Sequence, residues 1–136
     1  MTRRIVILLL CLLAATHCFG ASPDLLRQQA LCARLADSFN YSKLITEAEK
    51  YKHMAEAADD KRGMAFSEFY LGVGMLYTNR GKAASACLND AQRLAVELDN
   101  DSLRSLVQNS LGIYEIMHNN NLSLGQWHFT EALKYS

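Results

Sequence analysis

The sequence predicts an all-α protein built from three tandem antiparallel helical hairpins. Pro23 is the only proline among the 136 residues, so none interrupts a later helix. Apolar residues recur at steps of three and four, which is the spacing of one helix face, and strand-like alternation is missing. The sequence also repeats at a period of forty residues, which is typical of helical repeat proteins.

The first twenty residues predict a secretory signal peptide. Arg3 and Arg4 precede an apolar run over residues 5–15, and small residues then lead to Gly20. The run is shorter than the roughly 20 residues that a membrane-spanning helix needs. We therefore expect cleavage after Gly20, leaving residues 21–136 as one domain in the periplasm or outside the cell.

Six helices are expected in that domain, at residues 23–38, 42–58, 62–78, 82–98, 102–118 and 123–135. The segments NYS, NRG and NNNLS separate the two helices of each hairpin, and ADDKRG and DNDS separate one hairpin from the next. Asp60, together with either Asp101 or Ser102, is an expected helix N-cap because short polar side chains bond to the first free amides of a helix.

The forty-residue repeat places a leucine and a small residue at one point of each first helix. The leucines are Leu31, Leu71 and Leu111, and the small residues that follow them are Cys32, Gly72 and Gly112. Glycine inside a helix costs about 1 kcal/mol relative to alanine. Close packing of the second helix of each hairpin should offset this cost. The expected partners in the second helices are Ala84, Leu88 and Ala91, and, after one inserted turn residue, Gly125, Phe129 and Ala132.

This pattern resembles the tetratricopeptide repeat (TPR), a helix-turn-helix unit with Leu-Gly in its first helix. The period differs, forty instead of 34, and Gln28, Glu68 and Gln108 stand where an early tryptophan is usual. The proline that normally ends each unit is also missing. The longer unit is similar to repeats in exported sensor regions of bacterial signalling proteins. The resemblance covers the whole mature domain and implies a right-handed superhelix, whose first helices line a groove for a peptide or partner domain.

Carried over position by position, the resemblance implies a set of groove-facing residues. They are Gln29, Ala33, Phe69, Val73, Tyr77, Asn109, Ile113 and Met117. Phe69 and Tyr77 are the expected anchors, because aromatic side chains dominate interface energies. The alternative is that several of these residues belong to the core between repeats. Gln29, Phe69 and Asn109 stand where some family members have lysines that grip a C-terminal carboxylate, which argues against binding of chaperone tails.

No constellation of residues predicts catalysis, a cofactor or a metal site. His53, His118 and His128 occur singly, without a metal-binding pair on one helix face. A site joining His118 and His128 across the third turn remains an alternative. Cys32 and Cys87, the two cysteines left after processing, lie on apolar helix faces and are expected to be free and buried. We do not expect an enzyme.

The charge balance narrows the class of partner. Without Arg3 and Arg4, 12 of the 14 basic residues remain against 14 acidic ones, a net charge of about −2. This balance argues against nucleic acid and anionic membrane surfaces. We expect an exported module that binds protein or peptide, as the sensory region of a signalling protein. The alternatives are a free-standing secreted scaffold and, less favoured, a helical accessory region of an enzyme.

The last hairpin is expected to leave apolar residues uncovered. Trp127, Phe129 and Leu133 have no following repeat to pack against them within the sequence. We therefore expect residues 21–136 to be a segment of a longer repeat array, truncated at its C-terminal end, or to self-associate through this hairpin.

Overall fold

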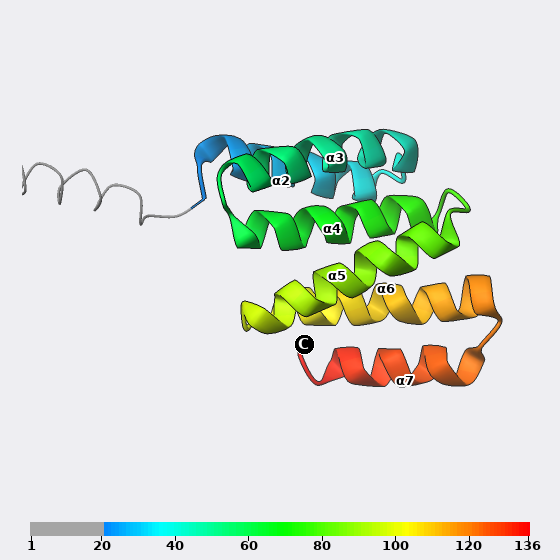
Figure 1. Cartoon of the computed structure of the whole chain (residues 1–136). Coiled ribbons are helices and arrows are strands. Elements are labelled where there is room, and N and C mark those ends of the chain that lie inside the picture. Colours follow the sequence, from blue (N-terminus) through cyan, green and yellow to red (C-terminus); the bar gives the residue numbers. More distant parts are fainter. Residues whose placement is uncertain (1–20) are drawn as a thin grey trace, which may run out of the picture.

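The computed structural model describes residues 21–136 as six α-helices joined by short turns (Figure 1). They are α2 (Pro23–Asp37), α3 (Tyr41–Ala57), α4 (Lys61–Leu76), α5 (Gly81–Glu97), α6 (Asp101–Asn119) and α7 (Leu122–Leu133). Each expected helix is present, with its ends within two residues of the expected ones. None of the described helices is long and apolar enough to cross a membrane. The signal-peptide prediction for residues 1–20 lies outside the described residues.

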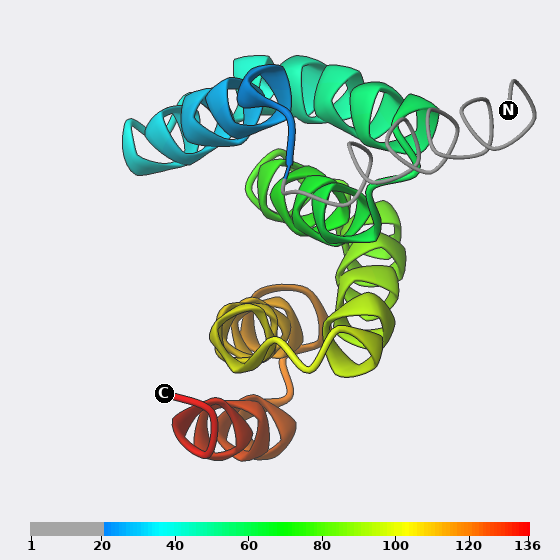
Figure 2. The same cartoon turned by 90° about the vertical axis from the view of Figure 1, so that its left-hand side faces the viewer.

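Consecutive helices pack against each other, and the first helices of successive hairpins are also in contact. Thus α2 contacts α4, and α4 contacts α6. Within residues 21–136, α3, α5 and α7 make no equivalent contacts with one another. Viewed along the helices, α2, α4 and α6 follow each other on one side of the stack, and α3 and α5 lie on the other side (Figure 2).

Helix α4 lies at the centre and is buried on several sides, because α3 and α5 both pack closely on it. A Cβ atom added at Gly72 would lie 2.7 Å from the Leu88 side chain of α5. One added at Gly74 would lie 2.7 Å from Ile45 Cγ1 of α3. Two glycines two residues apart thus let two helices approach α4 from different sides, and an alanine at either position would have to displace a neighbour.

The third hairpin has its closest approach at a pair of glycines. A Cβ atom at Gly112 of α6 would lie 2.6 Å from Phe129 Cε1 of α7. One at Gly125 of α7 would lie 3.1 Å from the carbonyl oxygen of Gly112. The two helices therefore meet nearly backbone to backbone, and the Phe129 ring fills the space beside the contact.

All five turns between helices share one backbone geometry. In each turn one residue has a positive φ, and the next residue is the N-cap of the following helix; the positive-φ residues are Phe39, Asp59, Asn79, Asp99 and Asn120. The N-cap amide bonds back to the preceding helix, as from Asn40 to the Leu35 carbonyl (2.9 Å) and from Asn100 to that of Ala95 (3.0 Å). The first four turns are spaced twenty residues apart, and the fifth contains the one inserted residue.

The N-caps differ in part from those expected. Asn100, and not Asp101 or Ser102, caps α6: its side chain accepts a hydrogen bond from the Leu103 amide at 2.9 Å. Asp60 does occupy the N-cap position of α4, but its side chain makes no capping hydrogen bond. In all five turns, the residue directly after the positive-φ residue is the N-cap. The turn geometry therefore decides which of several adjacent polar residues caps the helix.

Candidate binding surface

The first helices carry a set of equivalent positions, which we call the first-helix face. Its twelve members recur at forty-residue spacing: Leu26, Gln29, Ala33 and Asp37 in α2; Phe66, Phe69, Val73 and Tyr77 at α4; and Leu106, Asn109, Ile113 and Met117 in α6. Steps of three and four residues put each group of four on one side of its helix. The contacts of α4 with α2 and α6 bring the three groups alongside each other.

Exposure separates the sequence-predicted groove residues into three groups: buried, half-buried and exposed. Phe69 is only 8% exposed and belongs to the core, so its burial does not support its expected role as an anchor. Ala33, Val73 and Ile113 are half-buried, whereas Tyr77 and Met117 are exposed, Met117 to 54%. The difference arises because the middle of α4 is covered by its neighbours, and the end of α6 is not.

Sequence reasoning missed one row of this face. Leu26, Phe66 and Leu106 are forty residues apart, and the leucines at both ends of the row are exposed large apolar side chains. The forty-residue spacing was the signal that could have identified them. They extend the apolar part of the face toward the helix N-termini.

A polar link joins α2, α3 and α4 at this face. Arg62 Nη1 donates to Gln29 Oε1 at 2.9 Å, and the Tyr51 hydroxyl donates to the same oxygen at 3.3 Å. The Arg62 guanidinium also lies over the Phe66 ring, 4.6 Å from its centroid. The side-chain oxygen of Gln29 is thus bonded to other residues of the chain. The first-helix face is therefore mainly apolar, with the Arg62 guanidinium at its border.

Three polar residues stand where a tryptophan is usual in the tetratricopeptide repeat. They are buried, and each contacts another helix. Gln28, Glu68 and Gln108 are each 7% exposed. Gln28 Nε2 donates to the Glu47 side chain of α3 at 2.7 Å, and Glu68 forms an ion pair with Lys52 of α3. In the third hairpin the pair is Gln108 Oε1 and His128 Nδ1, 2.7 Å apart. Because buried polar groups need partners, these residues fix the pairing of helices and are not free for a ligand.

The two cysteines of residues 21–136 are free, and only one of them is fully buried. Burial raises the pKa of Cys32 to about 12, with a smaller contribution from Glu47. Cys87 is half-buried, which corrects the expectation that both are buried; burial and the adjacent Glu68 raise its pKa to about 11. Both groups are protonated thiols at neutral pH and therefore weak nucleophiles.

The histidines of the third turn contact different helices. His118 Nε2 lies 3.1 Å from the carbonyl oxygen of Leu76, at the end of α4. His128 instead pairs with Gln108, and burial lowers its pKa. Among the residues that the structure describes, no group of three His, Cys, Asp or Glu side chains is placed to hold a metal ion.

The turns lie on two opposite sides of the stack, those after α2, α4 and α6 on one side and those after α3 and α5 on the other (Figure 1). We define the aromatic edge as the turns after α2 and α4 with the first two residues of α3 and α5, residues 38–42 and 77–82. There the rings of Tyr41 and Tyr77 stack with centroids 4.6 Å apart at an interplanar angle of 18°. Phe39 meets Tyr41 edge-on, with centroids 6.2 Å apart, and Phe39 is 75% exposed. These three rings form an aromatic cluster in which Phe39 and Tyr77 are exposed and Tyr41 is half-buried.

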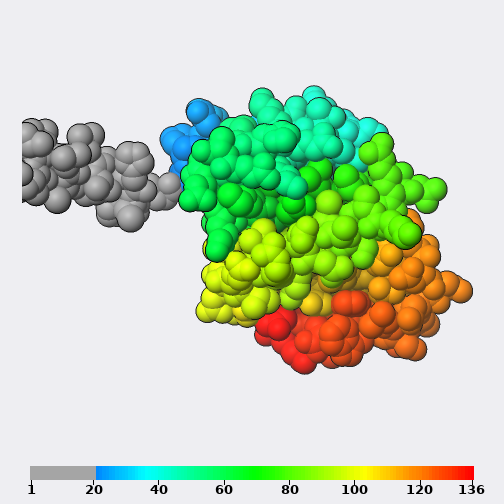
Figure 3. All heavy atoms as spheres, viewed as in Figure 1, coloured from blue at the N-terminus to red at the C-terminus, as the bar shows by residue number. Residues whose placement is uncertain are grey.

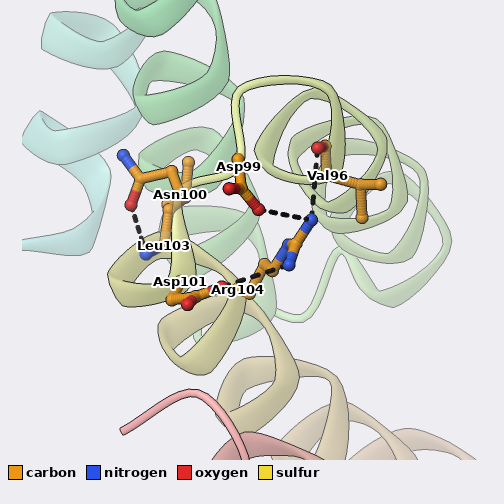
Figure 4. Close-up of polar contacts among 6 residues, drawn as sticks. All are labelled: Val96, Asp99, Asn100, Asp101, Leu103 and Arg104. Atoms are coloured by element: carbon orange, nitrogen blue, oxygen red, sulfur yellow. Dashed lines mark hydrogen bonds and ion pairs between the residues drawn. The ribbon is translucent and has the colours of Figure 1, made fainter.

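The acidic edge consists of the turns after α3 and α5, residues 58–62 and 98–104. Arg104 connects its turn: Nη1 donates to Asp101 Oδ1 at 3.1 Å, and Nη2 donates to the Val96 carbonyl at 3.2 Å (Figure 4). Nη2 also lies 3.5 Å from Asp99 Oδ1. Lys61, at the start of α4, pairs with Glu97 at the end of α5 in the same hairpin, at 3.2 Å. Lys61 and Arg104 are thus paired with carboxylates, whereas Arg62 bonds to Gln29, and Asp59 and Asp60 form no ion pair with a described residue.

The last helix leaves a third apolar region uncovered. In α7, Leu133 is 74% exposed and Trp127 is also exposed, while Phe129 is half-buried against Gly112. Helix α7 forms the end of the stack in the space-filling view (Figure 3).

Comparison of the chain with protein-family models, curated proteins and solved structures gives no significant match.

Proposed function

We propose that this chain binds an extended peptide or a segment of a partner protein along the first-helix face. In this proposal the six helices are three TPR-like hairpins of forty residues, arranged as a short right-handed superhelix with α2, α4 and α6 lining its groove. The chain would serve as the exported sensory or scaffold region of a signalling protein.

The packing order supports the repeat arrangement. First helices contact one another in succession, and second helices do not. In a stack of hairpins this difference puts the first helices on the inner side, where a ligand can contact several repeats at once. The recurrence of one turn geometry at twenty-residue intervals also supports three equivalent units.

The observation that carries the proposal is the exposure of apolar residues at equivalent positions of the first-helix face. Leu26 and Leu106 share one row of this face, and Tyr77 and Met117 share another; all four are exposed. Scattered exposed apolar residues need no explanation, but Tyr77 and Met117 lie at equivalent positions of two helices in contact, as residues of a binding patch would. Leu26 and Leu106 lie on α2 and α6, the two first helices that contact α4.

A peptide library displayed on phage and selected on residues 21–136 tests this function. Selected peptides should lose binding to the variants Leu106→Ser and Met117→Ser, because each substitution removes apolar contact area from the face. Leu133→Ser is the matched control, since it makes the same change to an exposed leucine of α7. Selected peptides that lose binding only to the Leu133 variant would overturn the proposal and assign binding to the last hairpin.

A further inference from the structure

The basic residues of the two edges have different partners. At the acidic edge and its adjoining helix ends, Lys61, Arg93 and Arg104 form ion pairs, and Arg62 instead bonds to Gln29. Near the aromatic edge, four basic residues form no ion pair with any residue of the described chain: Arg34, Lys43, Arg80 and Lys82. Asp37 is the acidic residue next to these turns. The aromatic edge thus has an excess of positive charge, although residues 21–136 together carry 12 basic against 14 acidic side chains.

The cations lie close to the aromatic cluster along the chain. Lys43 follows Tyr41 by two residues in the first turn of α3, and Arg80 and Lys82 follow Tyr77 by three and five residues. Segments of the α4–α5 turn project from the surface at this edge (Figure 3). An apolar cluster with cations around it is complementary to an apolar side chain flanked by carboxylates.

The conformation of Phe39 sets this turn apart from the other four. Its φ of 58° is left-handed, a region where Asp and Asn are tolerated and a bulky side chain is an outlier. The other four turns have Asp or Asn at this position. Burial does not offset the unfavourable backbone, because the Phe39 ring is exposed. A strained residue whose side chain points to solvent is more typical of binding sites than of structural turns.

We propose that the aromatic edge is a docking surface for an acidic segment of a partner protein that carries an aromatic or large aliphatic side chain. The rings of Phe39, Tyr41 and Tyr77 contact that side chain, and Lys43, Arg80 and Lys82 pair with flanking carboxylates. This site is distinct from the first-helix face and shares only Tyr77 with it. An anionic membrane is the less favoured partner, because residues 21–136 carry 12 basic against 14 acidic side chains.

Fluorescence anisotropy with two labelled peptides tests this proposal. The probes are Glu-Glu-Trp-Leu-Glu-Glu and its counterpart Lys-Lys-Trp-Leu-Lys-Lys, titrated with residues 21–136. The acidic peptide should bind about tenfold more tightly or better, and added salt should weaken it, because exposed charges are screened. Equal affinity for the two peptides would overturn the proposal.

Matched variants then locate the site. Phe39→Asn should weaken binding of the acidic peptide by about fivefold while the protein stays folded, because asparagine accepts the left-handed backbone. Lys43→Glu should weaken binding, whereas Lys50→Glu, the same change farther along α3, should not. Met117→Ser, on the first-helix face, should leave acidic-peptide binding unchanged even where it abolishes binding of library-selected peptides.

Several outcomes would contradict the site. They are full affinity in Phe39→Asn, equal loss in the two lysine variants, or loss in Met117→Ser. Sedimentation with vesicles of phosphatidylcholine and phosphatidylserine tests the other partner class. Vesicle binding that depends on serine-headgroup lipid and on Lys43 would assign the edge to a membrane surface and overturn the peptide proposal.

Discussion

The turns of the acidic edge and those of the aromatic edge have the same backbone form, in which one left-handed residue is followed by a helix N-cap. Their side chains, however, make different contacts. At the α5–α6 turn, Asp99 occupies the left-handed position, Asn100 caps the helix and Arg104 bonds across the turn. At the α2–α3 turn the left-handed residue is Phe39, with its ring in solvent. At the α4–α5 turn, Arg80 stands at the N-cap without a capping bond.

This difference shows that the same turn backbone can carry two different sets of side-chain contacts. At the α5–α6 turn, Asn100 and Arg104 bond to the backbone and to a neighbouring carboxylate, which contributes stability. The aromatic edge leaves cations unpaired and holds a strained phenylalanine, features that do not stabilise the fold. We infer that stability favours the first arrangement and that binding favours the second. The following substitutions test that inference, beginning with the largest expected effect.

Removal of the Arg104 guanidinium should have the largest effect. Arg104→Met keeps a long apolar side chain but loses the bonds to Val96 and Asp101 and the contact over the Tyr135 ring. Because hydrogen bonds of charged groups contribute about 1.5–3 kcal/mol, the free energy of unfolding should fall by about 2 kcal/mol. Urea unfolding measures it. Lys82→Met is the control at the aromatic edge and should change the free energy of unfolding little. An equal loss of unfolding free energy in the two variants would contradict the difference between the edges.

The two N-cap positions should respond differently to alanine. Asn100→Ala removes the capping bond to the Leu103 amide and should cost about 1 kcal/mol. Arg80→Ala removes no such bond and should leave the unfolding free energy nearly unchanged. Thermal unfolding of both variants compares them directly. A larger loss in Arg80→Ala than in Asn100→Ala would mean that the aromatic edge depends on its cation for stability.

The smallest expected effect concerns pH. Hydrogen bonds from Lys61 and then Arg93 hold the pKa of Glu97 below its ordinary value. A carboxyl group whose pKa is lower in the folded state stabilises the protein above its unfolded pKa, and that contribution is lost as the pH falls through the folded pKa. The difference in unfolding free energy between wild type and Glu97→Gln should therefore shrink as the pH is lowered from about 6 to about 3. A constant difference would contradict the ion-pair account of this edge.

The helices could be predicted from the sequence because each depends on local signals. Apolar spacing and the Asn, Asp and Gly residues of the turns place the six helices within two residues of their observed ends. Gly72 and Gly112 could be singled out because a glycine that recurs inside a helical pattern requires a reason. The structure shows Leu88 and Phe129 filling the space where a Cβ atom would stand.

The remaining features depend on tertiary contacts or on backbone angles that residue type does not determine. Phe69 belongs to an apolar strip in the sequence, but the helices on both sides of α4 bury it. From residue type alone, Gln28, Glu68 and Gln108 would be expected to face solvent. The structure pairs them with residues of α3 and α7. The left-handed Phe39 could not be anticipated, since residue preference alone argues against it.

The most direct test of the difference between the edges is the unfolding free energy of Phe39→Asn, measured by urea denaturation beside wild type. Asparagine relieves the left-handed strain, which costs a bulky residue about 1–2 kcal/mol, and the exposed ring contributes little packing. Asn79→Asp, at the equivalent position of the α4–α5 turn, is the control and should change little. The account predicts that Phe39→Asn raises the unfolding free energy by about 1 kcal/mol. A variant less stable than wild type would show that Phe39 stabilises the fold and would contradict the account.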